Sequence, residues 1–546
     1  MKVPKNLDER EFFYQDLIDK CNTSQDDRRI DYGNQRHMYL FGRGPDEDET
    51  PYNKIFPHID MLTSFLFASE TTRFSTHLGP HIADHEYLRI PAINRAVNDA
   101  WLMSNGDQTF GQGLTWSLVY NTMIFKIIVR ATDKGLQGID PFIIDPGSFG
   151  VLREDIPYLD RQEAVCHSYY TTKSQLELDL INHPSRETIL QHVDAFPRTT
   201  QEEKPTGVDR IILSSSSPTM QGNAQVPLNA QVDYLPKVSE DLIEMQELWF
   251  WDTELGDYRV VTRAKNAITL YDRQNFFIKG ELPFVQIAPN PMYSYFWGMS
   301  EVAGLVGLQR WRNQRVLQVK ELLDKQVDPP TSLTGWMGIL DEKNFALNKA
   351  GGVLSTDSMQ AKVDRHKPDI PQDIFAVIHE IDAMFAERSG LQNIMMGKGE
   401  SGVRSGRQTS ELARLASARI KKRALVVEDA LEKIATLYLK VLRKHDTNDL
   451  KDEKGNPFIP DQFTDDFVVK VDSHSNSPLF VEDHKQLAAE LLEAHAIDRA
   501  SFIDMLDPPM KDLLLRKLAL LEQAEKKEKE AAAAQEQQEN LKSEKK

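Results

Sequence analysis

The spacing of apolar residues predicts that the chain begins with helices. In EFFYQDLIDKC and HIDMLTSFLFASET, apolar residues recur every three or four positions, as they do along one face of a helix. Residues 92–124 show a long helical pattern with aromatic residues. Residues 1 to about 130 are therefore predicted to be mostly helical.

The pattern changes to that of strands between about residues 124 and 290. Short runs rich in β-branched and aromatic residues are separated there by turn residues. These runs are FKIIVRA, PFIIDPGSFGVL, AVCHSYYT, RIILSSSS, MQELWFWDT, YRVVTRA and AITLYDR. The stretch LWFWDTELGDYRVVTRAKNAITLYDR predicts a β-meander. TTKSQLELDL and SRETILQHV predict short helices, because capping-type residues precede each of them.

A helical period returns at Gly298. GMSEVAGLVGLQRWRNQRVLQVKELLDKQV predicts one helix of about 30 residues, roughly 45 Å long at 1.5 Å per residue. Asp328-Pro329-Pro330 ends it, since a residue before proline is disfavoured in the α region. About 40 residues without helical period follow and predict a small strand-and-loop module. QDIFAVIHEIDAMFAERSGL then predicts a second helix, so two helices flank the module.

A glycine-rich basic loop, residues 397–408, leads into a long amphipathic helix, residues 409–445. The first half of this helix carries Arg414, Arg419, Lys421, Lys422 and Arg423 against the single acid Glu411. Like charges four residues apart destabilise a helix. Contact with a polyanion or an acidic neighbour is therefore favoured over a purely solvated face. Residues 481–546 end the chain with further helical patterns and a polar, alanine-rich tail that is either a solvated helix or disordered.

Composition narrows the class of protein. With 546 residues, 40% of them hydrophobic and 27% charged, we expect a soluble chain of two to four folding units. The net charge of −18 means that any contact with nucleic acid is local. Cys21 and Cys166 match no metal or redox spacing, so we expect buried free thiols. The N-terminus shows no signal peptide pattern. Residues 282–300 carry no charge, but three prolines interrupt them, which favours a buried turn over a membrane span.

Motifs for catalysis are incomplete. Gly397-Lys398 lacks the Walker A spacing, Gly399-Glu-Ser401-Gly402-Val403 lacks the last glycine of GxSxG, and His379-Glu380 lacks the second histidine of a zinc protease. Acidic residues do gather at Asp140, Asp145, Glu154, Asp155 and Asp160, as in a two-metal nuclease. Asp140-Pro141 and Asp145-Pro146 are typical turn dipeptides, so turns are favoured there. A metal-dependent DNA-processing enzyme remains the alternative function, and a helical scaffold without a DNA role is a third.

The order of several segments resembles the portal proteins (head-to-tail connectors) of tailed bacteriophages, especially short-tailed ones. The segments are ELPFVQIAPNPMYSYFWGMSEVAGLVGLQRWRNQ, VDPP at the end of the long helix, GVRSGRQTSELARLASARI, and FIIDPGSFGVLREDIPYLDRQEAVCHSYYTTKSQLELDL. The resemblance extends over most of the chain from about residue 80, and the C-terminal tail does not contribute to it.

This resemblance implies an α+β portal fold with a helical and β wing, a two-helix stem, a small α/β clip, a long tunnel helix and a helical crown. It places the wing at residues 1–297, the stem helices at 298–327 and 371–391, and the clip at 328–370. The tunnel loop, tunnel helix and remaining wing take 392–480, and the crown takes 481–546 with its low-complexity tail.

The resemblance further implies a ring, usually of twelve subunits, around a DNA channel at one capsid vertex, assembled in the host cytoplasm. Its partners are double-stranded DNA, the terminase large subunit, a tail adaptor or head completion protein, and the major capsid and scaffolding proteins, with no cofactor, metal, membrane or catalysis. We expect DNA contacts at Lys398, Arg404, Arg407 and Arg414, and basic stem positions at Arg315, Lys320 and Lys325. Clip docking is expected at Trp336, Met337, Lys343 and Arg365, although Trp336 and Met337 also fit a small core.

Overall fold

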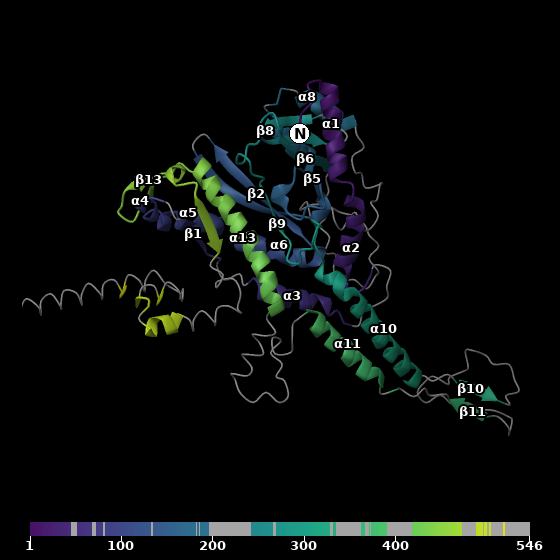
Figure 1. The fold of residues 1–546 in the computed structure, drawn as a ribbon. Coiled ribbons are helices and arrows are strands. Elements are labelled where there is room, and N and C mark those ends of the chain that lie inside the picture. Colours follow the sequence, from purple (N-terminus) through teal and green to yellow (C-terminus); the bar gives the residue numbers. More distant parts are fainter. Residues whose placement is uncertain are drawn as a thin grey trace, which may run out of the picture. The chain divides into compact units, whose positions relative to one another are not determined.

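The computed structural model describes most of the chain in two units. The described residues are 1–44, 52–67, 72–79, 82–132, 135–181, 183–184, 186–195, 242–265, 269–327, 331–334, 362–365, 371, 373–389, 418–471, 488–494, 496–499, 502–503 and 517–518. The first unit comprises Met1–Leu66 and Phe74–Val471, and the second comprises Phe67–Arg73 and Asp472–Lys546. Figure 1 shows the helices and strands.

Five antiparallel strands form one sheet in the order β4-β5-β6-β7-β8. Its strands are β4 (Phe149–Val151), β5 (Ala164–Thr172), β6 (Leu242–Asp252), β7 (Asp257–Ala264) and β8 (Thr269–Gln274). Strands β6 to β8 form the predicted meander. The predicted strand at RIILSSSS lies outside the described residues.

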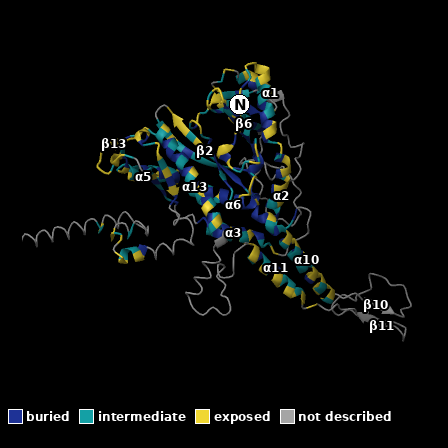
Figure 2. Cartoon of the chain, in the orientation of Figure 1, coloured by how far each residue is buried: buried dark blue, intermediate teal, exposed yellow. Residues whose placement is uncertain are grey.

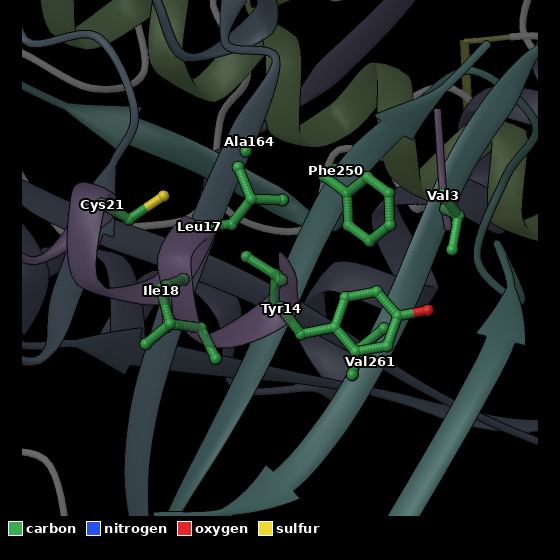
Figure 3. Packing of buried hydrophobic residues seen from close by; sticks show 10 residues of the cluster. Val3, Tyr14, Leu17, Ile18, Cys21, Ala164, Phe250 and Val261 are labelled. Carbon is green, nitrogen blue, oxygen red and sulfur yellow. The ribbon is translucent and has the colours of Figure 1, made fainter. Parts of the chain in front are cut away.

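Helix α1 (Leu7–Cys21) covers this sheet with one apolar face. Tyr14, Leu17 and Ile18 pack there against Phe250 and Val261, as Figure 3 shows. Both cysteines are buried and free, as expected, and they belong to this one cluster although 145 positions separate them. The predicted short helices are confirmed as α7 (Lys173–Asp179) and α8 (Arg186–Ala195), with the Thr172 hydroxyl accepting from the Gln175 amide at 3.2 Å.

A three-stranded sheet in the order β3-β2-β9 has helices packed against it. Its strands are β2 (Met123–Thr132), β3 (Gly135–Ile144) and β9 (Phe284–Ile287), and the helices are α6 (Gly106–Tyr120) and α13 (Ala418–His445). Helix α5 (Ile90–Met103) packs against both of these helices. Trp101 of α5 contacts Phe125 of β2 and Tyr438 of α13, with ring centroids 6.2 and 5.7 Å apart. The core thus joins segments that lie more than 300 residues apart in sequence.

The long helical pattern over residues 92–124 forms two helices, α5 and α6, and its last two residues begin β2. Asn105 adopts a left-handed conformation, with φ of 54°, between the two helices. The Trp101 indole folds over the break and donates to the Asp107 carboxylate at 2.9 Å. A side chain at Gly106 would collide with this ring, so the glycine makes the corner possible.

Asp140-Pro141 was also predicted to form a turn and instead lies inside β3, where Pro141 is opposite Ile127. Because β3 is the edge of its sheet, a proline without an N–H is tolerated there. Asp145-Pro146 does begin a turn, and the Asp145 carboxylate caps it by accepting from the Gly147 amide at 2.6 Å.

Two antiparallel helices, α10 (Glu301–Val327) and α11 (Asp373–Ser389), confirm the predicted helix pair. Helix α10 begins at Glu301, three residues later than expected, because Gly298 is left-handed with φ of 67°. Between the two helices in sequence, β10 (Thr331–Thr334) pairs antiparallel with β11 (Lys362–Arg365). The helical and strand content is that of an α+β protein.

The remaining elements of the first unit are α2 (Gln25–Phe41), α3 (Ile55–Leu66), α4 (Asp84–Tyr87), β1 (Phe74–Leu78), β12 (Leu450–Lys451), β13 (Pro457–Phe458) and β14 (Phe467–Val471). Strand β1 pairs with β14 and β12 pairs with β13. In the second unit, residues 488–493 are helical. None of the helices in the described part of the chain is long and apolar enough to cross a membrane.

Candidate nucleic-acid interface and its supporting joint

The structure describes only part of the predicted site. The expected DNA-contacting residues Lys398, Arg404, Arg407 and Arg414, and the clip residues Trp336, Met337 and Lys343, lie outside the described residues. Arg365 ends β11, where its Cα is opposite that of Thr331. These positions stay predictions.

The three basic candidates on α10 point in different directions. Lys320 and Lys325 are exposed, whereas Arg315 is half-buried and donates from Nη1 to Gln318 at 2.7 Å. Steps of five residues rotate a side chain by about 140° around a helix of 3.6 residues per turn. The three side chains therefore cannot all face one channel. Two exposed acids, Glu321 and Asp324, lie between Lys320 and Lys325 in sequence.

The start of α10 is fixed to the rest of the unit by its backbone and cap. Ser300 donates its hydroxyl to the Val119 carbonyl at 2.6 Å and accepts from the Ala303 amide at 3.1 Å. A Cβ on Gly298 would lie 2.8 Å from the Asn290 carbonyl oxygen. The chain therefore enters α10 along one defined direction.

A buried carboxylate, Glu301, joins the first turn of α10 to α13. Arg423 of α13 lies 2.9 Å from Glu301 Oε2, and His58 of α3 lies 3.6 Å from Oε1. The Asn290 amide donates to Oε2 at 3.3 Å. Burial on its own raises the pKa of Glu301, but His58 and Arg423 hold that pKa below its usual value. The side chain is therefore a charged connection between three helices.

Arg423 belongs to the basic stretch for which the sequence predicted a polyanion or an acidic neighbour. The structure supplies the acidic neighbour at this position, namely Glu301. Lys422 beside it is exposed. The charge of the stretch is thus partly neutralised inside the protein.

A second carboxylate, Asp382 of α11, ties that helix to α10 and to the segment before α3. Lys54 Nζ lies 2.5 Å and Arg312 Nε lies 3.0 Å from Asp382 Oδ1. Burial alone raises the pKa of Asp382, and these two cations lower it below the ordinary value. Ion pairs therefore hold α11 to α10 and to the segment before α3.

Two buried side-chain amides of α10, Gln309 and Asn313, make further polar contacts with the preceding segments. Gln309 accepts from the Lys54 amide at 3.1 Å and donates to the Tyr52 carbonyl at 3.0 Å and to Asn313 at 2.8 Å. Asn313 in turn donates to the Gly42 carbonyl at 2.9 Å. Sequence reasoning missed these residues, although two amides four positions apart in an apolar stripe were a usable signal.

The carboxyl-terminal end of α13 is held independently of Glu301. Lys440 pairs with Glu281, and Arg443 pairs with Asp465. Lys444 donates to the carbonyls of Phe276 and Phe277, at 3.1 and 2.5 Å. Helix α13 is thus fixed by several contacts at this end, whereas the described contacts near its beginning include one buried ion pair.

The acidic residues considered for a nuclease do not form a metal site in the structure. Asp140 forms a two-pronged pair with Arg130, and Asp155 lies 2.5 Å from Arg153. Asp145 is buried as a turn cap, and burial raises its pKa to about 6. Glu154 accepts from the Trp297 indole at 2.7 Å. In the described ranges, no group of three or more His, Cys, Asp or Glu residues is placed to hold a metal ion.

Comparison with known families gives an independent result. Residues 107–475, more than half of the chain, match the family model described as Phage SU10 portal protein. A comparison with curated proteins found no match to the chain. The match contains the five-stranded and the three-stranded sheet and the helices α10, α11 and α13.

Proposed function

Because the chain belongs to the phage SU10 portal protein family, we propose that it forms a ring at one capsid vertex and serves there as the conduit for double-stranded DNA. The genome enters through this ring during packaging and leaves through it during ejection. The protein is thus a structural component of the virion that assembles in the host cytoplasm and performs no hydrolysis itself.

The observation that carries this proposal is the arrangement of α10, β10, β11, α11 and α13 inside the family match. We assign α10 and α11 to the stem, the β10–β11 pair to the clip, and α13 to the tunnel helix. The preceding sheets and helices form the wing, and residues 481–546 form the crown. Glu301 then connects the stem to the tunnel helix within one subunit.

The charge of the chain suits a conduit better than a tight DNA binder. Each phosphate that a protein neutralises releases counterions and adds affinity. A net charge of −18 limits such contacts, so DNA can slide. In this proposal Arg404 and Arg407, repeated around the ring, guide the duplex by weak contacts.

The clip end of the stem is proposed to dock the terminase large subunit during packaging and a tail adaptor or head completion protein afterwards. Trp336, Met337, Lys343 and Arg365 are the residues proposed for this docking. The wing is proposed to meet the major capsid and scaffolding proteins. The number of subunits is proposed to be twelve.

Negative-stain electron microscopy of the purified protein tests this function. The proposal predicts rings with a central hole, together with unchanged linear DNA after incubation with magnesium. Compact monomers that cleave DNA under those conditions would support the nuclease alternative and refute the conduit.

A further inference from the structure

Helices α1 and α2 follow one another in the first unit (Figure 1). Several of their arginines contact other elements of this unit. The Arg28 guanidinium lies 3.6 Å from the centroid of the Trp297 ring and donates to the Pro146 carbonyl at 2.7 Å. Arg29 donates to the Gly147 carbonyl at 2.9 Å. Arg36 is buried as well. The positive charge of these helices is thus largely used for internal packing.

Most carboxylates of the same two helices are exposed, whereas Glu11 lies 3.8 Å from Arg263. The exposed acidic residues are Asp8, Glu9, Asp19, Asp26, Asp27 and Asp31. Those in the first turn of each helix also stabilise the helix dipole. Asp19 and Asp31 lie beyond the first turns, so the dipole does not account for them. The outer face of α1 and α2 is therefore acidic.

Each of the two helices carries a large apolar side chain that is exposed among these acids, Phe12 on α1 and Ile30 on α2. Phe12 is 76% exposed and lies four residues from both Asp8 and Asp16, on the same side of α1. Ile30 is 53% exposed and lies four residues after Asp26 on α2. Figure 2 shows exposed positions along both helices. A partner helix that covers both side chains would remove their apolar surface from water.

We propose that this outer face of α1 and α2 binds a cationic amphipathic helix of a partner protein. Lysines or arginines of such a helix pair with the carboxylates, while its apolar stripe covers Phe12 and Ile30. The acidic charge repels the phosphates of nucleic acid and of anionic lipid. Two copies of this acidic face repel one another, so the face does not pair with itself. Contact with a different face of a neighbouring copy is distinguished by the native mass in the test below. This proposal does not depend on the DNA conduit.

The binding test uses a fluorescein-labelled peptide of lysine and leucine, about five helical turns long, with its leucines on one face. Fluorescence anisotropy measures its binding to the full-length protein at low salt. We expect saturable binding that weakens as salt is raised. We also expect the double variant Phe12→Ser, Ile30→Ser to bind at least about tenfold more weakly, since buried aromatic anchors dominate such interfaces.

A matched control is the double variant Leu178→Ser, Ile181→Ser, which removes two side chains that are each 61% exposed elsewhere in the first unit. It is expected to bind the peptide like the wild type. A scrambled peptide of the same composition, without an apolar face, is expected to bind more weakly. All proteins are first compared by melting temperature.

Three results would overturn the proposal. They are absence of peptide binding to the wild type, equal binding by the Phe12, Ile30 variant, and a changed native mass of that variant. The last result would assign the face to a contact between copies of this chain.

Discussion

The connection between α10 and α13 gives the sharpest prediction about the structure. Glu301→Gln keeps the size of the side chain and one oxygen acceptor but removes the negative charge. Arg423 then remains in a site where its side chain is only 18% exposed, without its carboxylate partner. The beginning of α13 should detach more often from the start of α10.

The size of the effect follows from burial. Removing one member of a buried ion pair costs about 3–5 kcal/mol. Because Arg423 keeps some solvent contact and glutamine still accepts a hydrogen bond, we expect about 2 kcal/mol. A local opening that is easier by this amount raises amide hydrogen exchange roughly thirtyfold.

Hydrogen exchange measured by mass spectrometry can resolve the two ends of α13. Exchange should rise near Ala418 and stay unchanged near His445, where other contacts hold the helix. Glu281→Gln is the matched control, since it removes the half-exposed pair with Lys440 on the same helix. A solvent-screened pair contributes less than about 1 kcal/mol, so this control should change exchange little.

A double variant isolates the cause. Combining Glu301→Gln with Arg423→Met leaves no buried cation and should restore most of the lost protection. Equal exchange in Glu301→Gln and Glu281→Gln, or faster exchange along the whole of α13, would refute the role given to Glu301.

Three further predictions concern other parts of the chain. Gly298→Ala should lower stability by about 1–3 kcal/mol, measured by thermal melting, because φ there is 67° and the new Cβ would lie 2.8 Å from a carbonyl oxygen. Burial lowers the pKa of His167 well below its ordinary value, so stability falls as the pH drops below about 6.5, where the unfolded chain gains a proton. Between about pH 7.5 and 5.5, the melting temperature of His167→Phe should therefore fall by less than that of the wild type. An equal fall in both proteins would contradict this. The double variant Arg404→Ala, Arg407→Ala should leave rings intact and reduce genome retention in particles. Unchanged retention would contradict the predicted contact between the loop and DNA.

Local sequence patterns predicted the elements whose signals lie within one segment. The meander β6–β8 and the helices α10 and α11 follow from apolar spacing and from the proline stop after Val327. The boundary between α5 and α6 was missed, although Asn105-Gly106 is a helix-ending signal. The collision between a side chain at position 106 and Trp101 is a tertiary effect that the period cannot reveal.

Long-range contacts explain the rest of what the sequence could not predict. Strand β1 was not predicted because its five residues pair with β14, almost 400 positions later. The Glu301–Arg423 pair joins residues 122 positions apart, so only the fold shows which acid neutralises the basic stretch. For the candidate site, the residue types and their order indicated the loop and the helix pair. Which side chains of α10 are exposed depends on how the helix packs, and the sequence alone did not show this.

A native mass measurement of the purified full-length protein tests the central claim, a closed ring of subunits, most directly. The account predicts one dominant species whose mass is a whole multiple of 62.4 kDa, with twelve as the expected number of chains. The same species should persist after Arg404→Ala and Arg407→Ala. A monomer of 62.4 kDa at micromolar concentration, or an open series of masses without a preferred number, would contradict it.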